Sequence, residues 1–376
     1  MKRPSRVGRR KFLRESVGRL AASAAGPILA SEAALRAQNM QNISADKSNA
    51  LRSNGAIQIS RDLFPQQDLL KQRVERIKQQ IEKQRHAADS RLVTVAAFQM
   101  RNHCAGLKGK EDNLNRMLAA ISAATCEGVQ ILTFPELCLS GYFTRLEGSA
   151  EEAIAANHSL ADEAGKGRYL TALQEAAARS KMVLAFGFAE KAGNEYFDAV
   201  GVIDATGGWL GVRRKNPLYP MDHETRSFSE PDRSLRSVVL QTRYGKVGIS
   251  CCFDGEFPES VRRMRLDGAE ILLWCNAALG NPVLGTSHRL NLAGAHAETN
   301  FMWVVCCNAV GKKCSGASVI SSPSGEPLVI LSPGEEALGI ATIDLRMSQD
   351  WATWRDRLAF EIHSQIPKAT DTATQK

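Results

Sequence analysis

The stretch from Lys246 to Ser260 reads KVGISCCFDGEFPES. An apolar run typical of a buried strand ends at two cysteines, an acidic residue follows, and Pro258 begins a helix where its missing N–H costs nothing. A thiol at such a turn lies near backbone N–H groups, which stabilise both a thiolate and an oxyanion. The stretch therefore predicts a strand–turn–helix unit that presents a reactive cysteine.

On both sides of this stretch, short apolar or β-branched runs alternate with helical periodicity from Arg91 onward. The strands expected are 93–99, 129–134, 182–188, 200–204, 209–213, 238–241, 246–250, 271–274, 303–308 and 318–321, and the helices are 112–125, 164–180, 258–266 and 287–298. These strands are hydrophobic throughout, which indicates sheets covered on both faces and an α/β architecture. Neither glycine-rich phosphate-binding pattern occurs, so we expect no nucleotide cofactor.

Two other predicted strand ends carry groups that complement a thiol. The run 131–134 leads into Glu136, and a carboxylate with few polar neighbours is partly desolvated and becomes a stronger base; a solvated loop glutamate is the alternative. The segment 211–218 carries three successive cations ending at Lys215, of which one would face a site, unless they only protect an edge strand. Nucleophile, base and cation are the set needed for covalent attack on a carbonyl or nitrile carbon.

These three segments, in this order and spacing, resemble the nitrilase superfamily of carbon–nitrogen hydrolases. The similarity extends to 196–204, 268–274 and 304–311, and so covers about residues 91–345. The resemblance implies an α-β-β-α sandwich that associates into a homodimer or larger homo-oligomer. With seven scattered histidines and no Cys-x-x-Cys pair among nine cysteines, we expect neither a metal centre nor any other cofactor.

The resemblance also assigns the catalytic roles. It makes Cys252 the nucleophile, Glu136 the general base and Lys215 the cation that stabilises the tetrahedral intermediate. Cys251 is then the neighbour that faces the core, and the backbone N–H of Phe253 is a further oxyanion donor.

A second glutamate and a tyrosine complete the expected site. A second glutamate commonly follows the lysine in this family; Glu224 is the candidate and Glu230 the alternative. Tyr142, shortly after the base, is expected to contact the substrate or its oxyanion.

The expected reaction is hydrolysis of a non-peptide C–N bond in a small amide or N-carbamoyl compound through a cysteine thioester. A nitrilase is the main alternative, and an exported binding protein without activity is a weaker one. Relatives often have Asn after the Tyr of the 196–204 segment, where this chain has Phe197 and Asp198, and they often have Arg where this chain has His296, so the substrate stays open.

The N-terminus has the three parts of an export signal. Basic residues with paired Arg9 and Arg10 precede a weakly apolar stretch and a small residue at position 37, which resembles the twin-arginine signals of bacteria. We therefore expect a signal peptide at 1–37, recognition by the twin-arginine export machinery and a periplasmic location. A linker and an amphipathic helix at 38–90, a hydrolase domain at 91–345 and a C-terminal extension at 346–376 complete the predicted organisation.

The formal charge of +8 is unevenly distributed. Residues 1–91 carry a net +11 and residues 92–376 a net −3, so a nucleic-acid partner is not indicated. Removal of residues 1–37, which carry a net +7, would leave about +1. No run of eighteen apolar residues occurs, so no spanning helix is expected. The basic excess is therefore confined to the N-terminal region, and the partner that the resemblance implies is a small-molecule substrate.

Overall fold

The computed structural model describes residues 67–350 apart from 103, 105, 144–148, 221–222, 232–236, 279–286 and 312–313. The described residues all lie in the second of two compact units of the chain, Ile57–Lys376. The predicted signal at 1–37 and most of the predicted linker and C-terminal extension lie outside them. Among the described helices, none has the length and apolar character needed to cross a membrane.

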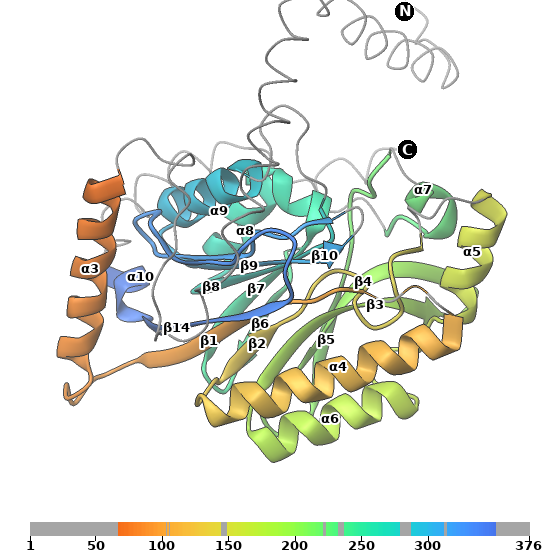
Figure 1. The fold of residues 1–376 in the computed structure, drawn as a ribbon, viewed down its shortest axis with the longest axis horizontal. Coiled ribbons are helices and arrows are strands. Elements are labelled where there is room, and N and C mark those ends of the chain that lie inside the picture. The colour runs from red at the N-terminus through yellow and green to blue at the C-terminus, as the bar shows by residue number, and fades with distance from the viewer. Residues whose placement is uncertain are drawn as a thin grey trace, which may run out of the picture. The chain divides into compact units, whose positions relative to one another are not determined.

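Two six-stranded mixed sheets stack face to face in this unit (Figure 1). The first has the order β14-β1-β2-β3-β4-β5 and consists of β14 (Ala337–Asp344), β1 (Leu92–Gln99), β2 (Ile131–Thr133), β3 (Val183–Ala192), β4 (Glu195–Ile203) and β5 (Trp209–Arg214). The second has the order β13-β12-β9-β8-β7-β6 and consists of β13 (Pro327–Ile330), β12 (Val319–Ser321), β9 (Trp303–Asn308), β8 (Ile271–Asn276), β7 (Gly245–Cys251) and β6 (Val239–Thr242). A small separate ladder pairs β10 (Val310–Gly311) with β11 (Cys314–Ser315).

Helices cover the outer face of each sheet (Figure 1). The helices α4 (Gly106–Cys126) and α6 (Arg168–Ser180) pack on the first sheet, and α8 (Pro258–Leu266) and α9 (Ser287–Asn300) on the second. Between the sheets, aliphatic side chains such as Val95, Ile131 and Ile249 form one buried cluster. Because both faces of each sheet are covered, the strands need apolar residues at nearly every position, as the sequence shows.

The parallel strands determine where the turns that carry Glu136 and Cys252 lie. In the first sheet β2 runs parallel to β1 and β3, and in the second β7 and β9 run parallel to β8. Glu136 follows β2 and Cys252 follows β7, so both residues lie just beyond the carboxyl end of a parallel strand. Such ends are where open α/β sheets present functional side chains.

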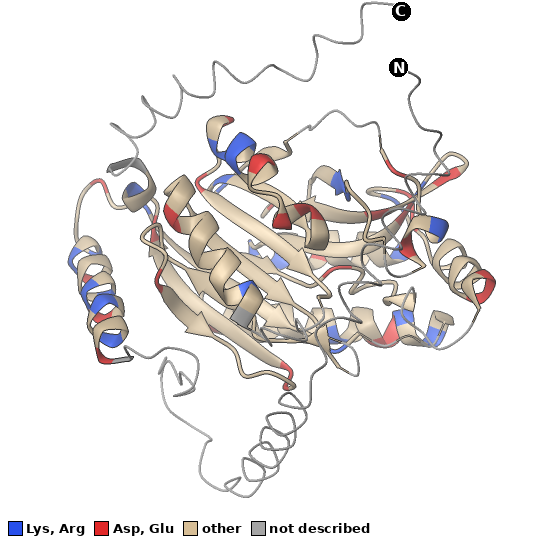
Figure 2. Ribbon diagram, turned by 90° about the horizontal axis from the view of Figure 1, so that it is seen from above, with Lys and Arg blue, Asp and Glu red and all other residues tan. Residues whose placement is uncertain are grey.

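The amphipathic helix predicted before the hydrolase domain is α3 (Gln67–Gln84). Its residues Val74, Ile77 and Ile81 are buried, and the last two join the cluster between the sheets. Arg73 of this helix pairs with Glu326 at 3.3 Å. Lys and Arg positions alternate with Asp and Glu positions along α3 in Figure 2. The apolar stripe therefore docks α3 on the domain.

Several elements were not expected from the sequence. They are β10, β11, β13, β14, α5 (Ala150–Ser159), α7 (Glu224–Ser227) and α10 (Arg346–Asp350). Strand β14 pairs antiparallel with β1 over eight residues. It is therefore the edge strand of the first sheet, a position at which the sequence predicted no strand. Helix α4 also starts earlier than predicted, at Gly106 rather than at residue 112.

Candidate active site

Glu136 lies in a tight turn after β2, and its side chain is fully buried. The next residue, Leu137, has a φ of +47°, a left-handed conformation that is uncommon outside glycine. Gly187 of β3 runs against this turn so closely that a Cβ there would lie 2.1 Å from the backbone nitrogen of Leu137. The backbone nitrogen of Ala277 donates to Glu136 Oε2 at 2.8 Å. The two sheets together therefore fix the carboxylate.

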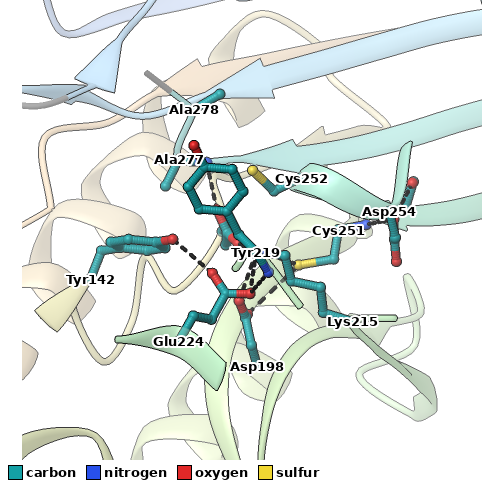
Figure 3. A network of polar contacts seen from close by, with 12 residues as sticks. Tyr142, Asp198, Lys215, Tyr219, Glu224, Cys251, Cys252, Asp254, Ala277 and Ala278 are labelled. Carbon is teal, nitrogen blue, oxygen red and sulfur yellow. Dashed lines mark hydrogen bonds and ion pairs between the residues drawn. The ribbon is translucent and has the colours of Figure 1, made fainter. Parts of the chain in front are cut away.

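Lys215 follows β5 and is also fully buried. Its Nζ lies 2.5 Å from Glu136 Oε1. The same atom lies 2.7 Å from Glu224 Oε1 and 3.4 Å from Asp198 Oδ2 (Figure 3). Burial lowers the pKa of Lys215, but the surrounding carboxylates outweigh it and hold this pKa well above its ordinary value. Lys215 is therefore a fixed positive charge at neutral pH.

The two arginines before Lys215 have separate partners. Arg213 donates to Asp254 at 3.0 Å, and Arg214 donates to Glu190 at 2.7 and 2.9 Å. Of the three successive cations, only Lys215 lies in the carboxylate cluster.

Glu224, on the short helix α7, is the second glutamate of the cluster, whereas Glu230 is exposed. The Tyr142 hydroxyl donates to Glu224 Oε2 at 2.9 Å, and the backbone nitrogen of Tyr219 donates to Oε1 at 2.9 Å. Burial raises the pKa of Glu224, although the nearby Lys215 charge opposes this. Tyr142 thus orients a carboxylate of the site, a contact that the sequence did not predict.

Asp198 is a third carboxyl group in the cluster and was not among the residues expected to act there. It lies on β4, is 1% exposed and has Lys215 Nζ and Cys251 Sγ as neighbours, the latter at 3.6 Å. Burial, reinforced by the negative charge of Glu136, raises the pKa of Asp198 well above its ordinary value. The only signal in the sequence was indirect, the departure from the family pattern at Phe197 and Asp198.

The ligand atoms of Glu136, Asp198 and Cys251 lie close enough together to hold a metal ion. The Lys215 ammonium, however, contacts two of these three residues directly. Two of the three donor groups are thus already ion-paired with a protein cation, and the cluster fits a proton-transfer network better than a metal centre.

Cys252 occupies the turn after β7 and has a φ of +44°, which costs about 1–2 kcal/mol for a residue with a Cβ. It begins the 3-10 helix η3 (Cys252–Glu256). Its carbonyl accepts from Trp274 Nε1 at 2.9 Å, and Asp254 Oδ1 accepts from the backbone nitrogen of Cys251 at 2.7 Å. The turn is strained and firmly held, as expected where a side chain must be presented for chemistry.

The inside of this turn is packed without spare room. A Cβ on Gly255 would lie 2.4 Å from Trp274 Nε1. His296, which stands in place of an arginine common in relatives, is 3% exposed and its Nε2 donates to the Gly255 carbonyl at 2.8 Å. Burial lowers the pKa of His296, so its ring is neutral at neutral pH. His296 therefore packs under the turn as a neutral side chain that supports the Gly255 carbonyl.

The two adjacent thiols lie in different surroundings (Figure 3). Cys251 Sγ is 4.0 Å from Glu136 Oε1, but the residue is fully buried in the cluster between the sheets. Burial and the charges of Asp198 and Glu136 raise the pKa of Cys251 well above its ordinary value, which opposes thiolate formation. Cys252 is 4% exposed, and its Sγ is 4.0 Å from Arg289 Nη2. The strained turn at the strand end favours Cys252 as the nucleophile, and proximity to Glu136 favours Cys251.

Phe253 follows the cysteines, and its ring makes edge contacts with Tyr219 at 5.2 Å and Phe257 at 5.3 Å between centroids. Its side chain thus bridges the turn after β7 and the segment that leads to Glu224.

Comparison with known proteins gives one consistent result. Residues 94–353 match the family model described as carbon-nitrogen hydrolase. The chain is 30% identical over 293 residues to an N-carbamoylputrescine amidase of Solanum lycopersicum, covering 72% of this chain and 94% of that protein. It is 28% identical over 272 residues to a citrullinase of Francisella tularensis, covering 68% and 92%. A crystal structure of an amidase from Nesterenkonia sp. superposes with a TM-score of 0.56 at 25% identity, covering 73% of this chain and 97% of that one.

Proposed function

The chain belongs to the carbon-nitrogen hydrolase family and is an enzyme of the amidase type, and we propose that it hydrolyses a small amide or N-carbamoyl compound through a cysteine thioester. The single observation that supports the chemistry best is the buried network of Glu136, Lys215 and Glu224 beside the strained turn at Cys252. It combines a base, a cation and a nucleophile within one site.

In the first half of the reaction Glu136 takes the proton of the Cys252 thiol, and the thiolate attacks the carbonyl carbon of the substrate. The carbonyl oxygen becomes an oxyanion, which Lys215 and the backbone N–H of Phe253 stabilise. Glu136 then gives its proton to the nitrogen, the C–N bond breaks, and ammonia or an amine leaves. The acyl or carbamoyl group remains on Cys252 as a thioester.

In the second half a water molecule gives a proton to Glu136 and attacks the thioester carbon. The C–S bond breaks, the acid is released, and the Cys252 sulfur recovers its proton from Glu136. Glu224 holds Lys215 against Glu136 throughout, and Tyr142 holds Glu224. The pair of glutamates thus keeps the ammonium in place while one of them carries the proton.

An ammonia-release assay tests the substrate class. The panel holds simple amides, N-carbamoyl amino acids, N-carbamoylputrescine, citrulline and nitriles, because the similar N-carbamoylputrescine amidase and citrullinase act on carbamoyl compounds by name. We expect turnover of amide or carbamoyl members. Turnover of nitriles alone would replace the proposal with a nitrilase, and a chain that turns over no member would contradict it.

The first prediction separates the two adjacent thiols. Cys252→Ala should abolish turnover, whereas the matched Cys251→Ala change should keep most of it, because a core cysteine acts as a small apolar residue. Both variants are made in a Cys126→Ser background, since Cys126 is exposed and would react with thiol reagents. Iodoacetamide labelling located by peptide mass spectrometry should find Cys252. Loss of activity and labelling in Cys251→Ala alone would move the nucleophile to Cys251.

A further inference from the structure

Arg289 is a buried cation beside the nucleophile that the proposed mechanism does not use. It lies in the first turn of α9 and is 6% exposed. Its guanidinium packs over the Trp274 ring, 4.8 Å from the centroid, and its Nη2 lies 4.0 Å from Cys252 Sγ. The aromatic ring and the burial hold the side chain in one place next to the reacting sulfur.

The hydrogen-bonding groups of this guanidinium are only partly paired. Nη2 donates to Glu256 Oε1 at 2.6 Å. Nε and Nη1 are buried and find no acceptor among the residues that the structure describes. Arginine carries five N–H donors, and buried donors without partners cost free energy, so native proteins rarely leave them. Two such donors beside a nucleophile point to an acceptor that arrives with the substrate.

The charges around Arg289 leave it able to bind an anion. Its partner Glu256 is 27% exposed, so solvent screens that carboxylate. The neighbouring His296 is neutral, because burial lowers its pKa. The other buried cation of the site, Lys215, already contacts three carboxyl groups. Arg289 is therefore the group best placed to receive a negative charge of the substrate.

We propose that Arg289 binds a carboxylate of the substrate, so that the enzyme acts on carbamoyl or amide compounds that carry a carboxylate close to the scissile C–N bond. A guanidinium matches the planar geometry of a carboxylate and donates to both of its oxygens. Since the substrate carbon must approach Cys252 Sγ to about 3–3.5 Å, a group bound at Arg289 lies only a few bonds from that carbon. This inference rests on the proposed hydrolase function and narrows its substrate class.

The test compares two substrates of equal length with the same scissile group, N-carbamoylglycine and N-propylurea. We expect the wild-type enzyme to prefer N-carbamoylglycine. Arg289→Gln should lower kcat/KM for this substrate about 10- to 100-fold, mainly through KM, the size expected for a charged hydrogen bond. The rate with N-propylurea should change by less than about threefold, because no charged contact is lost. Arg289→Lys should recover part of the loss, since it keeps the charge without the planar fork.

Arg263→Gln is the matched control. Arg263 lies on the neighbouring helix α8, its side chain is 51% exposed and its partner is Asp267. This variant should keep the wild-type preference between the two substrates.

Two results would overturn the proposal. Equal loss on both substrates, together with slower alkylation of Cys252 by iodoacetamide, would mean that Arg289 stabilises the thiolate and not the substrate. A wild-type preference for N-propylurea that Arg289→Gln leaves unchanged would mean that no anion binds there.

A second measurement does not depend on turnover. N-carbamoylglycine and acetate should slow the alkylation of Cys252 in the wild-type protein but not in Arg289→Gln. If no member of the ammonia-release panel is turned over while this protection is observed, the hydrolase proposal fails and the anion site stands. Equal protection, or none, in both proteins contradicts the anion site.

Discussion

Asp198 is the residue whose protonation the fold controls most directly. Three buried carboxyl groups surround one ammonium in the cluster, so ionisation of all three would leave a net charge of −2 without water to screen it. Burial and the Glu136 charge raise the pKa of Asp198 well above its ordinary value. The raised pKa therefore favours the protonated form of Asp198 beside Glu136.

The stability of Asp198→Asn should therefore depend on pH in a defined direction. An acid whose pKa is raised on folding contributes stability that is complete below its unfolded pKa of about 3.9 and is lost as pH rises through the folded value. Asparagine does not titrate, so from about pH 4 upward the unfolding free energy of the variant should rise relative to that of wild type. The rise should be about 1.4 kcal/mol for each unit by which folding raises the pKa of Asp198.

Urea unfolding at several pH values measures this difference. Asp89→Asn is a control of opposite sign, because the Arg346 hydrogen bond lowers the pKa of Asp89, and its stabilising effect is lost as pH falls. A difference between Asp198→Asn and wild type that stays constant with pH would show that Asp198 has an ordinary pKa.

The sequence predicted some of the contacts between individual site residues and missed others. It named Glu136, Lys215 and Glu224, and the structure brings all three together. Without the family resemblance, the residues alone could not separate Lys215 from Arg213 and Arg214, because the partners of the two arginines, Asp254 and Glu190, are distant in the chain. Arg289 lies 37 residues from Cys252, and only the packing of α9 on the second sheet brings the two together.

Among the structural elements, strand β3 positions the catalytic base Glu136 through a glycine, Gly187, that packs against the Glu136 turn. A Cβ on Gly187 would lie 2.1 Å from Leu137 N and 2.5 Å from the Glu136 carbonyl carbon, and backbone atoms cannot move aside as a flexible side chain would. We expect Gly187→Ala to displace the Glu136 turn and lower kcat about 100-fold, since a shift of about 1 Å in a catalytic group has this effect. Overpacking should also cost about 1–3 kcal/mol in unfolding free energy.

The matched control is Gly208→Ala. There the nearest atom to a new Cβ is the Thr206 hydroxyl oxygen at 3.4 Å, an ordinary contact, so activity and stability should both stay near wild type. Steady-state kinetics well below the unfolding temperature separates the two effects of Gly187→Ala. A variant that is less stable but has unchanged kcat would show that β3 does not position the base.

The sequence predicted the helices and strands of the sandwich correctly where one clear local pattern was present. Helix α8 begins at Pro258 and ends at Leu266, as the proline and the helical spacing indicated. Strands β13 and β14 were missed, because the segments around them are interrupted by glycine, proline and charged residues and have neither clear alternation nor a long apolar run. Pairing with β1 along eight residues, rather than local preference, makes β14 a strand.

For the whole molecule, the basic charge is concentrated in the N-terminal residues of the sequence. The described part of the chain has Lys and Arg positions interspersed with Asp and Glu positions (Figure 2). The basic excess of the full sequence lies in residues 1–91, and the pattern at 1–37 resembles a twin-arginine signal. Association into a homo-oligomer stays a prediction, which light scattering of the purified protein would test.

We propose that the twin-arginine machinery exports the chain to the periplasm already folded. The buried cysteines fit this route, because Cys138, Cys275, Cys306 and Cys307 are enclosed in the folded domain and protected there from an oxidising compartment. Changing both Arg9 and Arg10 to Lys keeps the charge but removes the arginine pair that the translocase recognises. The full chain should then accumulate in the cytoplasm, and the same should occur with the unchanged chain in a host without the translocase. Fractionation followed by immunoblotting and ammonia-release assays measures both. Export of the doubly substituted chain at the wild-type level, or export without the translocase, would assign the N-terminus to another route.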